Sequence, residues 1–167
     1  MSHRHLKRPA VIFRDTTLSY ESLINKSLAL LNHMQKDFGV KAGDCIALEQ
    51  TKTVANVVTM FACYLGRITV NIVDLKTPAA YRDYKIEAMK CVASIRDEHA
   101  THPTALPTIR VDKIFEDLDS ELFPALDENL LVDGEMDDVI FIEWTSGSTG
   151  KPKGKIFISL TNLKFCK

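Results

Sequence analysis

The segment Thr145–Gly154, which we call the glycine-rich loop, contains the residue types that bind a polyphosphate. Its glycines let the backbone take conformations closed to other residues and approach a ligand closely. Hydroxyl and ammonium groups accompany them, and each hydrogen bond to a charged oxygen contributes about 1.5–3 kcal/mol. The candidate phosphate-binding residues are Thr145, Ser146, Gly147, Ser148, Thr149, Gly150, Lys151, Lys153 and Gly154. Such donors converging on one loop suit the phosphates of a nucleotide.

Two other interpretations of the glycine-rich loop predict different functions. The P-loop of nucleoside triphosphatases needs Ser or Thr after its Gly-Lys pair and a glycine five positions before that pair. This chain has Pro152 and Thr145 there, which excludes that class. A flexible Gly/Ser linker is the plainer interpretation. It is weakened because the loop lies between two strand-like runs, Val139–Ile142 and Lys155–Ile158, and holds a stiff Lys-Pro-Lys core.

The elements that must position this loop alternate between apolar strands and amphipathic helices. After Ser19, a helix N-cap residue, apolar side chains recur at helical spacing as far as Phe38, and Gly39 supplies a left-handed stop. A second helix runs from about Thr51 to Leu65, and Gly66 ends it. The other expected elements are strands at Ala10–Phe13, Asp44–Glu49, Ile68–Val73, Cys91–Ile95 and Val139–Ile142, and a weaker helix at Pro78–Lys90. This alternation predicts an α/β fold with a parallel sheet flanked by helices.

Three further segments carry weaker signals. Arg96–Thr108 has no period, which predicts a surface loop, and its His99 and His102 lack a third ligand at a convincing spacing, so we predict no metal site. The acidic run from Glu116 to Glu121 is typical of a solvated helix face. Val139–Ile142 is continuously apolar, as in a strand buried on both faces.

Composition and charge exclude several classes of function. The chain has 167 residues, enough for one domain. Its 21 basic and 22 acidic residues give a net charge of −1, which offers no field for nucleic acid or an anionic membrane. The longest apolar stretch, Val54–Leu65, is too short to span a bilayer. We therefore expect a soluble protein with no transmembrane segment and no nucleic-acid partner.

The cysteines and the amino-terminal residues bear on the compartment. Cys45, Cys63, Cys91 and Cys166 are widely spaced, and three of the four lie in apolar runs, as buried free thiols do. No disulfide framework or zinc site is predicted, which favours a reducing, cytoplasmic compartment. Residues 1–9 are basic and lack an apolar core for a secretory signal, so we expect a flexible arm, with a mitochondrial presequence as the alternative.

The glycine-rich loop, TSGSTGKPKG, resembles the signature loop of the adenylate-forming (AMP-binding) superfamily, which includes acyl-CoA synthetases and nonribosomal peptide adenylation domains. Two weaker features occur upstream in the expected order. Leu18–Leu23 is similar to the family's L[ST]YxEL motif, and Val40–Leu48 is similar to its G-V-x-x-G-D-x-V-A-L segment. The chain departs from the pattern at Asn71, where proline is usual, at Lys155, where an apolar residue is usual, and in lacking a His before Asn162.

The resemblance implies that residues 10–167 form an incomplete amino-terminal AMP-binding domain. In this family ATP, with Mg²⁺, and a carboxylate give an acyl-adenylate and pyrophosphate, and coenzyme A or another thiol then takes the acyl group. The resemblance implies that Thr145, Ser146, Gly147, Ser148, Thr149 and Gly150 contact the β- and γ-phosphates, and that Lys153 rather than Lys151 is the charge partner. The adenine, ribose and Mg²⁺ residues and the catalytic lysine lie downstream in the family, so no catalytic or metal residue is assigned here.

Three functions are consistent with this resemblance. The first is the amino-terminal part of an ATP-dependent, acyl-CoA synthetase-like ligase that is inactive as an isolated chain. The second is a non-catalytic remnant that binds phosphate or a nucleotide, and the third is part of a nonribosomal peptide-type adenylation domain. The sequence does not identify the carboxylate substrate or the oligomeric state.

Overall fold

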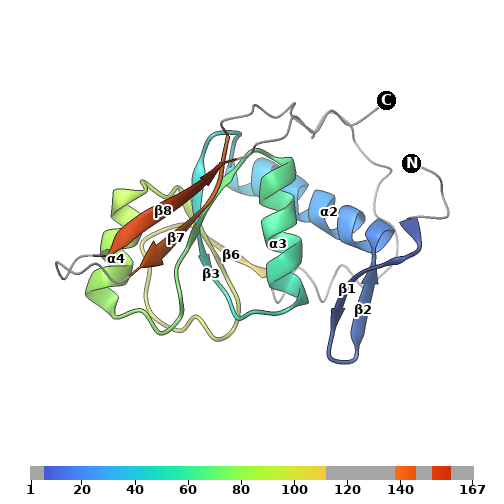
Figure 1. Cartoon of the computed structure of the whole chain (residues 1–167). Helices are drawn as coiled ribbons and strands as arrows, with labels where there is room; N and C mark the ends of the chain where they lie inside the picture. The colour runs from blue at the N-terminus through green and yellow to red at the C-terminus, as the bar shows by residue number, and fades with distance from the viewer. Residues whose placement is uncertain (1–5, 112–137, 146–151, 159–167) are drawn as a thin grey trace.

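The structure is a computed structural model that describes residues 6–111, 138–145 and 152–158. Its main sheet has the strand order β6-β5-β3-β4-β7-β8. The strands are β3 (Cys45–Glu49), β4 (Thr69–Ile72), β5 (Ala93–Arg96), β6 (Thr108–Arg110), β7 (Val139–Thr145) and β8 (Lys153–Ile158). All neighbours are parallel except β8, which runs antiparallel to β7 at one edge (Figure 1). The predicted α/β class with a parallel sheet is confirmed.

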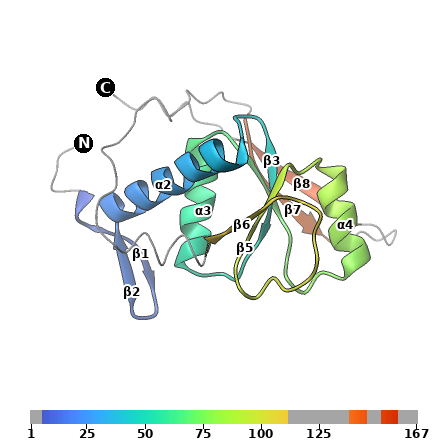
Figure 2. The same ribbon diagram turned by 180° about the vertical axis from the view of Figure 1, so that it is seen from behind.

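Helices cover both faces of this sheet. The helices α2 (Tyr20–Phe38) and α3 (Val54–Leu65) lie on one face, and α4 (Ala79–Ala88) lies on the other (Figures 1 and 2). The larger apolar core lies beneath α2 and α3, where Leu31 and Met34 pack with Ile46 and Ile95 of the sheet. A smaller core beneath α4 contains Cys45, Ala47, Val73 and Cys91. A sheet with strands between two helical layers is the arrangement that continuous apolar strands require.

Both predicted ends of α2 are confirmed. The Ser19 side chain accepts a hydrogen bond from the Ser22 N–H at 3.1 Å, so it caps an otherwise unpaired donor. Gly39 ends the helix with φ of 67°, a left-handed conformation that favours glycine. The α3 helix begins at Val54, three residues after the predicted start at Thr51.

A two-stranded hairpin precedes α2. Its strands are β1 (Pro9–Phe13) and β2 (Thr16–Ser19), paired antiparallel. The first strand and its turn at Arg14 were expected, whereas β2 was not, because four residues of the type Thr-Thr-Leu-Ser carry no apolar run. Residues 1–5 of the predicted amino-terminal arm lie outside the described residues.

Two sequence-based expectations around the sheet hold only in part. The surface loop expected over Arg96–Thr108 is present at residues 97–107, most of which are exposed or half-buried, but Arg96 is the buried last residue of β5, Asp97 is buried and Thr108 begins β6. The strand expected at Val139–Ile142 is present as the first part of β7, but only Ile142 of that run is buried, although β7 lies between β4 and the edge strand β8.

The cysteines and the acidic run are only partly within the described residues. Cys45, Cys63 and Cys91 are buried, as their apolar surroundings predict, whereas Cys166 and the acidic run at residues 116–121 lie outside the described residues. Among the helices that the structure describes, none combines the length and apolar character needed to cross a membrane.

Candidate functional site

The glycine-rich loop connects the last two strands of the sheet. Its first residue, Thr145, is the last residue of β7 and pairs with Lys153, the first residue of β8. The Thr145 hydroxyl donates to the Lys153 carbonyl at 3.4 Å, so the two ends of the connection are held together. Thr145, Lys153 and Gly154 are therefore described. The other predicted binding residues, Ser146, Gly147, Ser148, Thr149, Gly150 and Lys151, lie outside the described residues.

Gly154 permits the close packing of β8 against β7. A Cβ atom at this position would lie 3.2 Å from Ile142 Cγ2 and 3.5 Å from the Trp144 ring. Gly154 is also the residue opposite Trp144 in the register. A side chain at this position would therefore press on the indole at the base of the loop. This contact explains on steric grounds why the last residue of the motif is glycine.

The start of β7 is anchored to β4 at two points. Arg67, which precedes β4, donates two hydrogen bonds of 2.7 Å to the carboxylate of Asp138. The Thr69 hydroxyl donates to the Val139 carbonyl at 3.0 Å. A bidentate guanidinium–carboxylate pair fixes direction as well as distance. These contacts hold β7 in parallel register with β4, and thus determine where the glycine-rich loop begins.

A cavity of about 700 Å³ opens at the carboxyl ends of β3, β4 and β7. Its walls are residues 50–53 after β3, residues 73–76 after β4, the first turns of α3, and Glu143 and Trp144 of β7. Phe13 and Lys85 complete it from β1 and α4. Ligands of open α/β sheets bind outside the carboxyl ends of the strands, and small-molecule pockets measure about 300–1,000 Å³. The cavity has the place and the size of a ligand site beside the glycine-rich loop.

Gln50 is an unsatisfied polar residue in the wall of this cavity. Within the described part of the chain, neither the nitrogen nor the oxygen of its buried side-chain amide has a hydrogen-bond partner. A buried polar group without a partner costs about 1–3 kcal/mol. Both amide atoms have almost no exposed surface, so a ligand in the cavity would reach them only after the side chain turned.

Lys85 brings a cationic side chain to the same cavity. Its Nζ atom donates to the Thr77 hydroxyl at 3.5 Å and lies 5.8 Å from the centre of the Trp144 ring. Burial lowers the pKa of Lys85 below its ordinary value, and the carboxylate of Asp74 opposes part of that effect. The ammonium group is thus held at the cavity by an aromatic face and a hydroxyl.

Asn71 of β4 links two residues of the cavity wall, Trp144 and Lys85, by hydrogen bonds. Its side-chain oxygen accepts from Trp144 Nε1 at 2.6 Å, and its side-chain nitrogen donates to the Lys85 carbonyl at 3.0 Å and to Cys91 Sγ at 3.3 Å. Asn71 is completely buried. The amide that stands in place of the family's proline therefore fixes the residue immediately before the glycine-rich loop.

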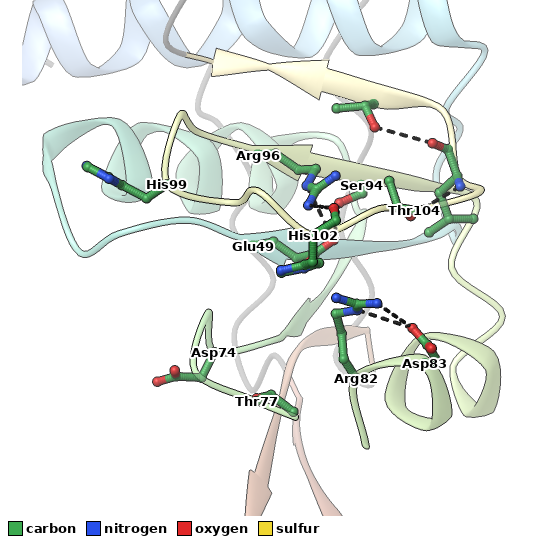
Figure 3. A network of polar contacts seen from close by, with 12 residues as sticks. Glu49, Asp74, Thr77, Arg82, Asp83, Ser94, Arg96, His99, His102 and Thr104 are labelled. Carbon is green, nitrogen blue, oxygen red and sulfur yellow. Dashed lines mark hydrogen bonds and ion pairs between the residues drawn. The ribbon is translucent and has the colours of Figure 1, made fainter. Parts of the chain in front are cut away.

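A buried polar cluster surrounds Glu49, the residue before Gln50 of the cavity wall (Figure 3). Glu49, the last residue of β3, accepts from the Ser94 hydroxyl at 2.6 Å and lies 3.8 Å from Arg96 Nε, and its second oxygen contacts His102 Nε2. Arg96 also donates to the His102 carbonyl at 2.5 Å. Ser94 donates to the carboxylate and not to the histidine, so the cluster lacks the order of a hydrolytic triad. It ties the segment after β5 to β3.

Asp97 fixes the segment after β3 that lines the cavity. It accepts hydrogen bonds from the Thr51 N–H and hydroxyl, both at 2.6 Å, and from the His99 N–H at 3.0 Å. Burial raises the pKa of the Asp97 carboxyl, but the hydrogen bonds from Thr51 and His99 outweigh it and hold the pKa below its ordinary value. The carboxylate therefore stays charged and keeps Thr51 in the cavity wall.

The two histidines of this region are separated in the structure. His102 contacts Glu49, whereas His99 lies 3.6 Å from Glu98 on the surface. In the described ranges, 6–111, 138–145 and 152–158, no three His, Cys, Asp or Glu side chains are grouped as metal ligands. No metal residue is assigned to this chain.

Sequence reasoning missed the cavity residues Gln50, Lys85 and Trp144 and the cluster around Glu49. One signal could have found part of them. Polar residues stand at the ends of two apolar runs, Glu49 and Gln50 at one and Arg96 and Asp97 at the other. Carboxyl ends of neighbouring parallel strands meet at one edge of the sheet, so polar residues at these positions converge.

Comparisons with known proteins agree with this architecture. The sequence model of the AMP-binding enzyme family matches residues 2–162. The 2-succinylbenzoate–CoA ligase of Bacillus licheniformis is 30% identical over 149 residues, which cover 88% of this chain and 30% of the ligase. Surfactin synthase subunit 1 of Bacillus subtilis is 29% identical over 147 residues, which cover 87% of this chain and 4% of the subunit.

A solved structure shows the same fold. The N-terminal subdomain of Klebsiella oxytoca NpsA, in complex with 3-hydroxybenzoyl-AMSN, superposes with a TM-score of 0.72 at 24% identity. The match covers 93% of this chain and 38% of that one. The chain therefore spans well under half the length of the relatives that it matches. Since the family match covers almost the whole sequence, this chain belongs to the AMP-binding enzyme family.

Proposed function

We propose that this chain is the phosphate-binding part of an ATP-dependent ligase that activates a carboxylate as its acyl-adenylate. The observation that carries the proposal is that the glycine-rich loop begins next to a residue of the cavity wall. Thr145 and Lys153, the paired ends of the glycine-rich loop, follow directly on Trp144, which lines a cavity of about 700 Å³. A loop of hydroxyls, glycine amides and ammonium groups then stands at the carboxyl edge of a parallel sheet.

The residue types of the glycine-rich loop suit a polyphosphate. In the proposed reaction the carboxylate oxygen attacks the α-phosphorus of ATP, and pyrophosphate leaves with the electrons of the broken bond. Donors already in place around the departing pyrophosphate stabilise the charge that it gains. The glycine-rich loop supplies those donors, and Lys153 supplies the positive charge. The Mg²⁺ that accompanies ATP has no assigned ligand in this chain.

We further propose that the 167-residue chain binds phosphate but does not form an acyl-adenylate by itself. It spans 30% of the length of the 2-succinylbenzoate–CoA ligase, so most of what that relative contains has no counterpart here. In a longer protein, coenzyme A or another thiol is the proposed acyl acceptor. The similarity to a surfactin synthase subunit favours a peptide-type adenylation domain as the second candidate.

Isothermal titration of the chain with pyrophosphate and with ATP tests phosphate binding. We expect saturable binding that Lys153→Ala weakens by about tenfold or more, the loss of one charge-assisted hydrogen bond, and that Lys151→Ala weakens less. Lys155→Ala is the matched control, because Lys155 lies on the same strand with its Nζ 5.0 Å from the Phe157 ring centre. No heat up to millimolar ligand, or equal losses in all three variants, would overturn the proposal.

The inactivity of the isolated chain needs a separate measurement. Carboxylate-dependent exchange of labelled pyrophosphate into ATP reports acyl-adenylate formation directly. We expect no exchange from the 167-residue chain with any carboxylate, at protein concentrations where titration shows pyrophosphate bound. Exchange above the protein-free rate would refute this part of the proposal and leave the phosphate site standing.

A further inference from the structure

Two cysteines far apart in the sequence lie in contact beneath α4. Cys45 is the first residue of β3, and Cys91 lies between α4 and β5. Their Sγ atoms are 3.9 Å apart, and one thiol donates a hydrogen bond to the other. Each residue is 8% exposed, so the pair is buried but not sealed from small solutes. The mutual contact distinguishes them from Cys63, which is completely buried in the other core.

A hydrogen bond and the strand register hold the two cysteine-bearing segments next to each other. The Val92 N–H donates to the Cys45 carbonyl at 2.9 Å. The residues that follow these two, Ala93 and Ile46, are paired in the register of β5 and β3. The two backbones are therefore fixed side by side. The sulfur atoms must close from 3.9 Å to the ~2.05 Å of an S–S bond, a change within the reach of side-chain rotation.

The surroundings favour one of the two thiols as the nucleophile. The hydrogen bond from Cys45 lowers the pKa of Cys91, burial opposes this, and the hydrogen bond from the Asn71 amide lowers it further. The same thiol–thiol hydrogen bond and burial raise the pKa of Cys45. Burial alone raises the pKa of Cys63. The thiolate is the reactive form, so Cys91 is the residue that reacts first.

We propose that Cys45 and Cys91 are a reversible oxidation site. A peroxide oxidises the two thiols, which then form an intramolecular disulfide with each other. The Cys91 thiolate attacks one peroxide oxygen, the O–O bond breaks, and Cys91 becomes a sulfenic acid while hydroxide leaves and takes a proton. Cys45 then attacks the Cys91 sulfur, and the sulfenic oxygen leaves as water with the Cys45 proton. Two thiols and one peroxide thus give one disulfide and two molecules of water, and a dithiol reverses the oxidation.

Oxidation has a structural consequence at the cavity. A disulfide changes the Cys91 sulfur that accepts the hydrogen bond from the Asn71 amide, and the Asn71 oxygen accepts from the Trp144 indole at 2.6 Å. Trp144 is the only tryptophan of the chain and immediately precedes the glycine-rich loop. The redox state of the cysteine pair is therefore coupled, through one buried side chain, to the base of the loop. Trp144 fluorescence reports the coupling.

The test uses the full chain with Cys166→Ser, which removes the cysteine outside the described residues. The folded protein is treated with hydrogen peroxide, free thiols are blocked, and the digested peptides are mapped by mass spectrometry. We expect a Cys45–Cys91 linked peptide that dithiothreitol releases, with Cys63 recovered as a free thiol. The Trp144 emission shifts with the same time course and returns on reduction.

Each alternative outcome would overturn a defined part of the inference. Cys45 and Cys91 recovered as separate thiols, at a peroxide concentration that oxidises glutathione in the same tube, would refute the site. So would a disulfide that forms equally fast in urea, because proximity in the folded chain would then be irrelevant. Linkage without a change in Trp144 emission would refute the coupling through Asn71. Cys63→Ala is the control variant and is expected to leave both readouts unchanged.

Discussion

Replacing Asn71 with leucine tests the account of how the glycine-rich loop is positioned. The variant keeps the number and branching of the side-chain heavy atoms and removes the amide that links Trp144, Lys85 and Cys91. It leaves the Trp144 N–H and the Lys85 carbonyl without their partner. Each buried polar group left unpaired costs about 1–3 kcal/mol, and Trp144 is half-buried and can reach water, so we expect a total loss of about 3 kcal/mol.

Urea denaturation followed by Trp144 fluorescence measures this loss as a lower free energy of unfolding. Ser27→Ala is the matched control, because Ser27 is equally buried and makes a single side-chain hydrogen bond, to the Val58 carbonyl at 3.2 Å. We expect that control to lose about 1 kcal/mol. If Asn71→Leu is no less stable than Ser27→Ala, the three contacts of Asn71 do not hold the base of the loop, and the reasoning is refuted.

Two further predictions follow from the geometry. A Cβ on Gly66 would lie 2.4 Å from Leu31 Cδ1, so Gly66→Ala should destabilise the α2–α3 core by about 1–3 kcal/mol. A Cβ on Gly39 would meet nothing within 4 Å, so Gly39→Ala should cost only about 1 kcal/mol of backbone strain. Thermal unfolding compares the two variants, and equal shifts in Tm would contradict the steric cause. Because the folded pKa of Asp97 is lowered, its stabilising contribution is complete above its ordinary value of about 3.9 and is lost as the pH falls through the folded pKa. Thr51→Val should reduce this acid-dependent loss and Thr51→Ser should keep it; identical stability–pH curves for the two would contradict the assignment.

Local patterns predicted the helices and most of the sheet. The ends of α2 follow from Ser19 and Gly39, because a cap and a left-handed glycine act within one turn of the helix. Apolar runs predicted β3, β4 and β7 for a similar reason, since burial on a sheet is visible in the residues of the strand itself. The short strands β2 and β6 were missed because three or four residues do not establish a period.

The pairings across the fold could not be predicted in this way. Glu49 contacts Ser94 and His102, which lie 45 and 53 residues away in the sequence. Cys45 and Cys91 are 46 residues apart. These contacts depend on the strand order, in which β5 crosses to the far side of β3, and no local pattern encodes that order. The cavity was missed for the same reason.

The composition of the glycine-rich loop predicted a phosphate site, and that assignment stays a prediction for its nine residues. The residues that frame the loop add physical reasons for it. Gly154 allows the strand to pack against Trp144, and Lys85 brings an ammonium group to the adjoining cavity. Neither reason could be read from the motif alone, because each depends on a neighbour from another segment.

The central claim is that the backbone amides of the glycine-rich loop bind the phosphates of a nucleotide. Nuclear magnetic resonance of the ¹⁵N-labelled chain, titrated with pyrophosphate, tests it residue by residue. We predict saturable shifts of the amide signals of Ser146, Gly147, Ser148, Thr149 and Gly150, reduced in Lys153→Ala and retained in Lys155→Ala. Shifts confined to other parts of the chain, with these five signals unmoved, would contradict the claim.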